Sequence, residues 1–479
     1  MSLTDKPSVP TGAVSPPGST VNRSAVLALL VSSHFMLNLD SAIVEVALPA
    51  LKEGLGFGLS DLSWVANAYI LTFGGFLLLG GRLGDTLGSR RVFTGGLTLF
   101  ALASLLGGLA SEPELIITAR AVQGLAAAVI SPTALSLLVQ VFPSGTAEER
   151  ARRGKALGTL GAVAATGGSV GYFLGGVLTE TLGWQSTFLV NVPVAAAAAA
   201  WARRLLPADG PRPARLRIDL GSALTGCAGM TLLVYALVEA GPNGLLSART
   251  LGLGGLSLGL LCWFVVRQRR SLDPLFPLRV LRHRAVRGAN AVAALVNMAI
   301  GPVIFFLSLY IQQVLDYSPS TAGLAILPVV LSITAASALA GRLLNVHSPR
   351  GVILTGLLLF AVGLVWLGRI SGQSYWFEVL GPECLVGLGG GLVFVTFTAC
   401  GTSGPDERDA GSASAVLTTS QKVGSAFGLA VLTGIAGVGA GSGDVSSGAG
   451  YGAAILAAAV PVLVAVVVST RWIPNRTQQ

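Results

Sequence analysis

Fourteen apolar runs, all but the short eighth long enough to cross a lipid bilayer, constrain this sequence more than any other feature. A transmembrane helix needs about 20 mainly apolar residues. Hydrophobic residues make up 52% of the 479 positions and charged residues only 11%, too little charge to cover a soluble protein of this length. We therefore predict an all-α integral membrane protein. Its expected spans are 25–49, 62–81, 92–110, 114–142, 156–178, 187–205, 219–240, 251–266, 286–312, 322–341, 351–369, 377–402, 411–438 and 451–470.

Lysine and arginine fall almost entirely on one side of this predicted arrangement. If the N-terminus is cytoplasmic, 26 of the 31 basic residues lie in cytoplasmic segments, and only Lys52, Arg249 and Arg369 lie on the opposite side. The other two, Arg120 and Lys422, fall within spans. Because cytoplasmic loops carry the excess of basic residues, both termini are expected in the cytoplasm. The same asymmetry explains the net charge of +9 without a nucleic-acid partner.

A repeated segment suggests how the chain is organised. Gly81-Arg82-Leu83-Gly84-Asp85 follows the second run, and Gly341-Arg342-Leu343-Leu344-Asn345 follows the tenth. Repeats in corresponding positions are typical of transporters built from two helix bundles. We predict a disordered cytoplasmic tail over 1–22, a six-helix bundle over 23–206, two inserted helices over 207–270, a second six-helix bundle over 271–470 and a cytoplasmic tail over 471–479.

The sequence lacks the motifs that most enzymes and ATP-driven pumps carry. It has no phosphate-binding G-x-x-x-x-G-K-[ST] motif, no cysteine and histidine spacing typical of a metal site, and no nucleophile–base motif. The four cysteines all lie in apolar runs, as small core residues do. We therefore predict no enzyme, no metal and no bound cofactor. Association with a separate ATPase chain is the less favoured alternative, because the halves are repeated.

Several segments together carry a resemblance to a known family. They are Leu39–Pro49, Gly81–Arg91, Arg120–Gly124, the glycines Gly158, Gly167, Gly171, Gly175 and Gly176, and the segments Leu232–Gly241 and Asp273–Leu278. From about residue 25 to 470 the chain resembles the major facilitator superfamily, and specifically its fourteen-span drug:proton antiporter family. Two positions depart from the family pattern: Glu45 stands where the family usually has Asn, and Tyr172 stands where it usually has Pro.

This resemblance implies a proton-coupled multidrug or antibiotic exporter that works by alternating access. The expected substrate is a small amphipathic drug, the energy source is the proton gradient, and the expected form is a monomer in a lipid bilayer. Arginine outnumbers lysine 27 to 4, which hints at a GC-rich bacterial source and hence at the bacterial cytoplasmic membrane. The alternative is a facilitator-type transporter of another small solute or metabolite.

The first span carries two carboxylates at hydrocarbon depth, where such groups usually face a cavity, pair with a cation or carry a proton. On a helical wheel, a polar stripe that suggests a cavity wall contains Glu45, and Asp40 falls roughly 100° away from Ser41. We therefore expect Asp40 to be a proton site or a structural partner, and Glu45 to face the cavity. The stripe consists of His34, Asn38, Ser41 and Glu45.

Arg120 is the other costly group in a membrane span. Counted at about 1.5 Å per residue, Arg120 and Asp40 lie at comparable depths, which permits a direct or water-mediated pair. The resemblance implies a role of Arg120 in proton coupling. The alternative is an arginine that only packs helices and is satisfied by backbone carbonyls. Gln123, one turn away, is a further cavity candidate.

The resemblance makes the loop after the second span a gate. Asp85 is expected to act as a latch that meets arginine side chains or a helix N-terminus, with plain helix capping as the alternative. Gly81, Gly88, Arg90 and Arg91 complete this loop.

Three further features are predicted from the chain. The glycines from 158 to 176 indicate close helix packing of the fifth span, expected against a helix of the other bundle. Lys422, near the middle of the thirteenth span, is expected to neutralise an acidic partner or to attract an anionic substrate group. Glu383 in the twelfth span is a weaker cavity candidate.

Overall fold

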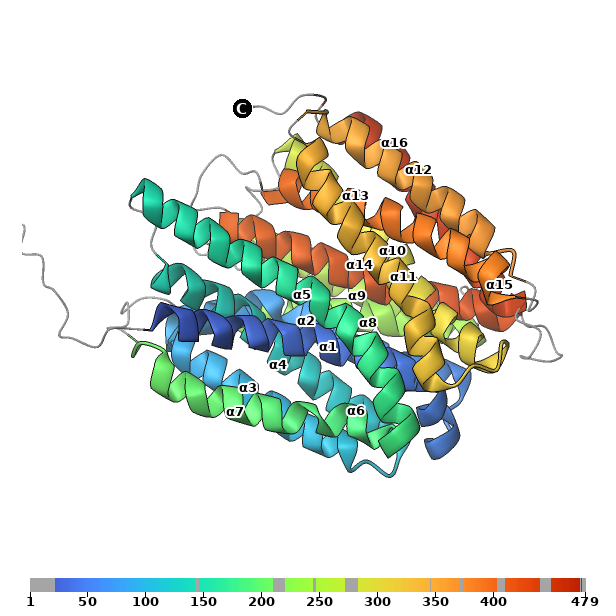
Figure 1. Ribbon diagram of the computed structural model, residues 1–479, viewed down its shortest axis with the longest axis horizontal. Coiled ribbons are helices and arrows are strands. Elements are labelled where there is room, and N and C mark those ends of the chain that lie inside the picture. Colours follow the sequence, from blue (N-terminus) through green and yellow to red (C-terminus); the bar gives the residue numbers. More distant parts are fainter. Residues whose placement is uncertain are drawn as a thin grey trace, which may run out of the picture.

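A computed structural model describes residues 22–142, 146–209, 220–243, 247–271, 283–344, 346–370, 374–402, 410–439, 449–473 and 475. Within these residues the regular structure is helical, and the long helices run side by side along the longest axis of the molecule (Figure 1). The predicted tail over 1–22 lies outside the described residues, except for Asn22.

The described residues up to 209, which we call the first half of the chain, form seven helices. These helices lie mainly in the lower part of Figure 1. Here α1 packs against α5 and α7, and α4 packs against α2 and α3. The sixth predicted span is divided into a short α6 and a longer α7. The helices are α1 (Arg23–Leu55), α2 (Leu59–Leu87), α3 (Ser89–Gly108), α4 (Pro113–Val141), α5 (Ala147–Leu182), α6 (Gln185–Leu189) and α7 (Asn191–Leu205).

Two helices, α8 and α9, follow the first half of the chain. The second half begins with α10 and lies mainly in the upper part of Figure 1. The helix α8 packs against α9, α2 and α14. Within the second half, α10 packs against α14 and α16, and α13 packs against α11 and α12. The elements are α8 (Leu220–Asn243), α9 (Ala248–Arg270), α10 (Arg284–Gln313), α11 (Pro319–Leu343), α12 (Pro349–Leu367), the π-helical turn η2 (Trp376–Leu380), α13 (Gly381–Thr402), α14 (Ala410–Gly439), α15 (Ala449–Ala457) and α16 (Ala459–Trp472).

Two helix pairs join the halves: α5 packs against α11, and α2 packs against α14. We refer to the side of the molecule where α1 begins as the Arg23 side and to the side where it ends as the Leu55 side. The predicted boundaries after residues 206 and 270 fall between helices, and the division into bundles stays a prediction.

Glycine and proline mark many of the helix ends. Gly56, Gly88 and Gly183 have positive φ angles of 69°, 98° and 81°, which a residue with a Cβ rarely adopts, and each follows a helix. Proline opens α4, α11 and α12, where its missing N–H has no helical partner to lose. These residues fix where the helices concerned begin or end.

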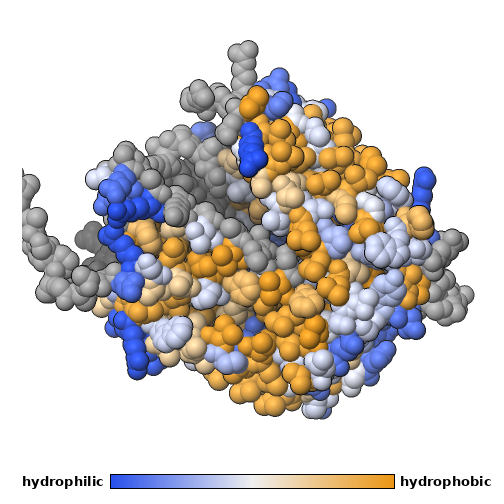
Figure 2. Space-filling view, viewed as in Figure 1, coloured by the Kyte–Doolittle hydropathy of each residue, from blue (hydrophilic) through white to orange (hydrophobic). Residues whose placement is uncertain are grey.

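The outer surface is apolar over most of the length of the helices. Figure 2 shows hydrophobic side chains across the middle of the visible face and hydrophilic ones toward its left and right edges. Leu102, Leu109 and Leu331 are more than half exposed, as expected for side chains that face lipid. Among the described residues, nine helices are long and apolar enough to cross a membrane. The protein therefore passes through the bilayer several times, and the count of fourteen stays a prediction.

Candidate functional site

The helix α1 presents two different polar faces. Asp40 is fully buried on one of them, with 0% of its surface exposed. The predicted stripe lies on another face and is partly exposed throughout. It consists of His34, Asn38, Ser41 and Glu45. The spacing along the helix therefore separates the two carboxylates as the sequence indicated.

Asp40 is held by three side chains from two other helices. Its Oδ2 atom lies 2.7 Å from an Nη1 donor of Arg120 on α4. Its Oδ1 atom accepts hydrogen bonds from the amides of Gln123, at 3.1 Å, and of Asn191 on α7, at 2.7 Å. The direct pair that comparable depths permitted is present, and every polar contact of this carboxylate is made inside the first half of the chain.

Arg120 is equally enclosed, with 1% of its surface exposed. Its Nε–H donates to the backbone carbonyl of Val65 at 3.0 Å, and Nη1 also donates to Oε1 of Gln123 at 3.0 Å. The guanidinium carbon lies 4.3 Å from the centre of the Tyr69 ring, within range of a cation–π interaction. Arg120 thus has both a carboxylate partner and a backbone carbonyl partner. The sequence offered a pair with Asp40 and an arginine satisfied by carbonyls as alternatives, and the structure contains both contacts.

Sequence reasoning missed three members of this network: Asn191, Ser104 and Tyr69. The hydroxyl of Ser104 on α3 accepts a hydrogen bond from the Gln123 amide at 2.9 Å. Asn191 carried a usable signal, because an asparagine within an apolar span needs a polar partner. Ser104 and Tyr69 carried none, since serine and tyrosine are common in membrane helices and only the fold brings them to α4.

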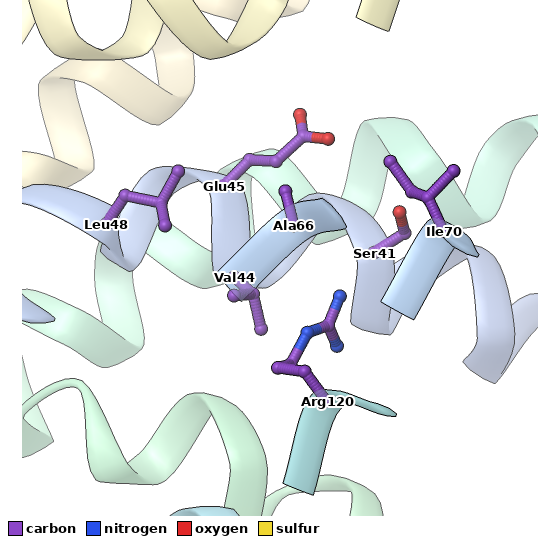
Figure 3. Close-up of a pocket in the computed structure, with 7 residues that line it drawn as sticks. All are labelled: Ser41, Val44, Glu45, Leu48, Ala66, Ile70 and Arg120. Atoms are coloured by element: carbon purple, nitrogen blue, oxygen red, sulfur yellow. The ribbon is translucent and has the colours of Figure 1, made fainter. Parts of the chain in front are cut away.

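Glu45 borders a small pocket between α1, α2 and α4 (Figure 3). The Arg120 guanidinium reaches this pocket from α4, and the Glu45 side chain extends from the opposite side of α1. The pocket is lined by Ser41, Val44, Glu45, Leu48, Ala66, Ile70 and Arg120. In this conformation the pocket is small, and its lining combines apolar walls with one carboxylate and one guanidinium.

Glu45 also lies at the interface between the two halves of the chain, which we call the seam. Its Oε2 atom accepts a hydrogen bond of 2.7 Å from the Tyr172 hydroxyl on α5. Its backbone carbonyl accepts one of 3.1 Å from Ser308 on α10, and Gln312 donates to the carbonyl of Val46 at 3.1 Å. The two residues that depart from the family pattern, Glu45 and Tyr172, therefore contact each other beside α10.

Lys422 approaches the same region from α14. Its Nζ lies 5.0 Å from the centre of the Phe73 ring, and its Cβ packs against Gly74 on α2. The lysine therefore lies beside α2, the helix that also lines the pocket next to Glu45, and makes no direct ion pair with that carboxylate. Its predicted role toward an acidic partner or an anionic substrate group stays a prediction.

The glycines of α5 pack differently from the expectation. A Cβ at Gly167, Gly171 or Gly175 would lie 2.7 Å from a backbone oxygen of α1, a helix of the same half. Only Gly176 meets the other half, where a Cβ would lie 2.2 Å from the carbonyl oxygen of Pro319 on α11. The prediction of a partner in the other bundle was wrong for the first three, because that stripe faces α1. The surroundings of Gly158 lie outside the described residues.

In the turn between α2 and α3, an acidic residue from elsewhere in the chain binds the start of α3. Asp209, after α7, accepts hydrogen bonds from the backbone N–H groups of Arg90, at 2.9 Å, and Arg91, at 3.3 Å. The Arg90 side chain also donates to the carbonyl of Arg203. Gly81 packs near Pro132 of α4 and Gly88 forms the turn, whereas the side chain of Asp85 lies outside the described part.

Glu383 binds the backbone of α11 and does not line the pocket. It is buried, and its Oε1 accepts a 3.2 Å hydrogen bond from the N–H of Val329, directly after Pro328 in α11. The Tyr375 hydroxyl donates to the carbonyl of Ala325 at 2.8 Å. In a regular helix the groups at 325 and 329 pair with each other. Glu383 and Tyr375 thus satisfy the backbone beside the proline, which corrects the expectation of a cavity group.

His34 and Asn38 complete the polar face of α1 toward the Arg23 side. The His34 ring lies 3.4 Å from the Ser131 hydroxyl on α4, and the Asn38 amide donates to the carbonyl of His34. The described residues contain no group of three side chains suited to hold a metal ion. The charged groups of the site are therefore carboxylate, guanidinium and ammonium.

Comparison with known proteins places these residues in a wider context. The family model of the Major Facilitator Superfamily matches residues 30–429. The chain is 39% identical over 459 residues to the cephamycin export protein CmcT of Amycolatopsis lactamdurans, covering 95% of this chain and 93% of that protein. It is 40% identical over 412 residues to the puromycin resistance protein pur8 of Streptomyces alboniger, covering 85% and 80%. It is 34% identical over 415 residues to the multidrug resistance protein Stp of Mycobacterium tuberculosis, covering 86% and 76%.

Proposed function

The chain belongs to the major facilitator superfamily, and from this premise we propose that it is a proton-coupled exporter of antibiotics or other small drugs. Its relatives are an exporter and resistance proteins for cephamycin, puromycin and several drugs, which supports a drug as the substrate. The single observation that carries the coupling is the fully buried Asp40–Arg120 pair, whose arginine lines the pocket beside Glu45.

The pair is suited to exchange a proton for a substrate because its charges have no access to bulk water. When the carboxylate of Asp40 takes up a proton, its attraction to Arg120 is lost and the guanidinium becomes an unpaired cation at hydrocarbon depth. That cation borders the pocket, so the charge state of Asp40 changes the electrostatic potential at the pocket wall. Proton and substrate binding are then coupled through Arg120.

The described conformation is closed on the Leu55 side, where α5 meets α11 and α1 meets α10. We propose that this side faces the exterior and the Arg23 side faces the cytoplasm, with fourteen helices crossing a bacterial cytoplasmic membrane. The basic residues are distributed as this orientation requires. Rocking of the two halves about the α5–α11 and α2–α14 seams would then open the pocket alternately to each side. We expect the unit of transport to be a monomer.

The test is transport in liposomes with an imposed pH gradient, with puromycin and ethidium as probes. Asp40→Asn keeps the size of the side chain and removes its ionisation, so gradient-driven transport should fall to the level of empty liposomes. Glu53→Gln is the matched control, because Glu53 is an exposed carboxylate on the same helix, and it should transport like the wild type. Full gradient-driven transport by Asp40→Asn would contradict the coupling. Transport that ignores the gradient would indicate a facilitator.

A further inference from the structure

The region where the halves meet holds two opposite charges that do not form a direct ion pair. Within the part of the chain that the structure describes, Glu45 and Lys422 share no contact of 4.0 Å or less, in contrast to Asp40 and Arg120 at 2.7 Å. The Asp40–Arg120 pair neutralises itself. Among the described residues, the charges near the pocket that lack an ion-pair partner are therefore Glu45, which lines it, and Lys422, which lies beside Phe73 and Gly74 beyond the lining: one negative group from α1 and one positive group from α14.

Both charges lie along one face of α2. Ala66 and Ile70 line the pocket with Glu45, and Phe73 and Gly74, one turn farther on, contact Lys422. The turn from Ile70 to Gly74 corresponds to roughly 6 Å along the helix. Ile70 is also packed against a buried cluster of Leu71, Ala426 and Ala430, whose two alanines follow Lys422 on α14. The two charged ends are thus joined by a continuous apolar wall.

Each charged group keeps capacity for another partner. The Tyr172 hydroxyl occupies Oε2 of Glu45 and fixes the carboxylate, and Oε1 accepts no hydrogen bond from the described residues. The Lys422 ammonium has three N–H donors, and its described contact is with the face of the Phe73 ring. A carboxylate and an ammonium with free hydrogen-bonding capacity at the two ends of an apolar wall form a site for two opposite charges.

We propose that Glu45 and Lys422 bind the two ends of an amphoteric substrate, a small molecule that carries a cationic amine and a carboxylate several bonds apart. This inference rests on the proposed export function and specifies the substrate class. A purely cationic molecule would pair with Glu45 but meet repulsion from Lys422, and an anion would meet the reverse. An amphoteric molecule satisfies both charges and leaves the net charge of the site unchanged.

The test compares two fluorescent dyes that differ in one group. Rhodamine 110 carries a cationic ring system and a free carboxylate, and its methyl ester, rhodamine 123, lacks the carboxylate. In proteoliposomes with a pH gradient, the wild type should transport the acid at least about fivefold faster than the ester, the discrimination expected from one unpaired charged group. Lys422→Met should slow the acid and not the ester, which removes the preference. Glu45→Gln should slow both dyes.

Glu53→Gln again serves as the control and should keep the wild-type preference. If both substitutions changed the two dyes by the same factor, the charges would act in packing or gating only, and the proposal would be overturned. It would also be overturned if the wild type transported the ester as fast as the acid, or transported puromycin but neither dye. A wild type that transports none of the three probes under a gradient would contradict the export function as well.

Discussion

The two charge pairs near α1 differ in almost every respect although their carboxylates stand five residues apart. Asp40 and Arg120 are fully buried, lie 2.7 Å apart and belong to one half of the chain. Glu45 and Lys422 are partly exposed, do not touch, and approach each other from different halves. In the function that we propose, the pair inside one half responds to protons, whereas the pair divided between the halves responds to a substrate and to the relative movement of the halves.

The largest effect is expected from breaking the buried pair on one side only. Arg120→Gln leaves Asp40 as an uncompensated buried carboxylate, which should destabilise the protein by about 3–5 kcal/mol and abolish gradient-driven transport. Adding Asp40→Asn removes the orphan charge, so the double variant should regain most of the stability but no transport. Thermal unfolding in detergent measures the stability of each variant. If the double variant were as unstable as the single one, the charge argument would fail.

The next largest effect is expected at the seam between α5 and α11. In Gly176→Ala the new Cβ would lie 2.2 Å from the Pro319 carbonyl oxygen, so the Leu55 side cannot close as described. Such overpacking costs about 1–3 kcal/mol and should shift the closed state toward the open state by roughly 5- to 150-fold. Cysteine labelling from the exterior measures this shift. Gly168→Ala, which has nothing within 4 Å of the new Cβ, should behave like the wild type.

Glu383 tests whether a buried carboxylate in the second half has a different role from Asp40. Glu383→Gln keeps an acceptor for the Val329 N–H and should retain stability and proton coupling. Glu383→Leu removes the acceptor beside Pro328 and should destabilise the protein by about 1–3 kcal/mol. Thermal unfolding and transport, measured together, distinguish these results. Loss of coupling in a stable Glu383→Gln variant would show that this carboxylate also carries protons.

The smallest effect is expected at the edge of the seam. The exposed Glu180 at the end of α5 accepts a 3.1 Å hydrogen bond from the N–H of Ser320 on α11, and the hydrogen bonds from Ser320 lower the pKa of Glu180. Because this pKa is lowered in the closed state, the hydrogen bond stabilises the closed state fully above the ordinary pKa of glutamate. This stabilisation is lost as the pH falls through the lowered pKa. Glu180→Gln should therefore open the Leu55 side less than Gly176→Ala does. Labelling that did not increase on acidification of the wild type would contradict this role.

Much of the helical arrangement was predictable because bilayer thickness and hydrogen bonding restrict what an apolar run can form. The 3.6-residue period of a helix was enough to separate Asp40 from the stripe that holds Glu45. Contacts between distant helices could not be predicted. The stripe of Gly167, Gly171 and Gly175 gives the close approach but not the partner, which is α1.

Residues that act on a neighbouring helix were the hardest to interpret. Glu383 in an apolar span suggests a cavity group, yet its partner is a backbone N–H next to a proline in another helix. Similarly, the acidic group that holds the start of α3 is Asp209, which lies more than a hundred positions along the chain. Neither pairing has a local pattern, because it depends on how whole helices pack.

The most direct test of the central claim is the release of protons on substrate binding. Purified wild-type protein in weakly buffered detergent solution should release about one proton per bound puromycin, because binding and ionisation of Asp40 are linked. Asp40→Asn should bind puromycin and release none, while Glu53→Gln releases as the wild type does. Release of the same quantity by Asp40→Asn would contradict the claim that the buried pair couples the proton to the substrate.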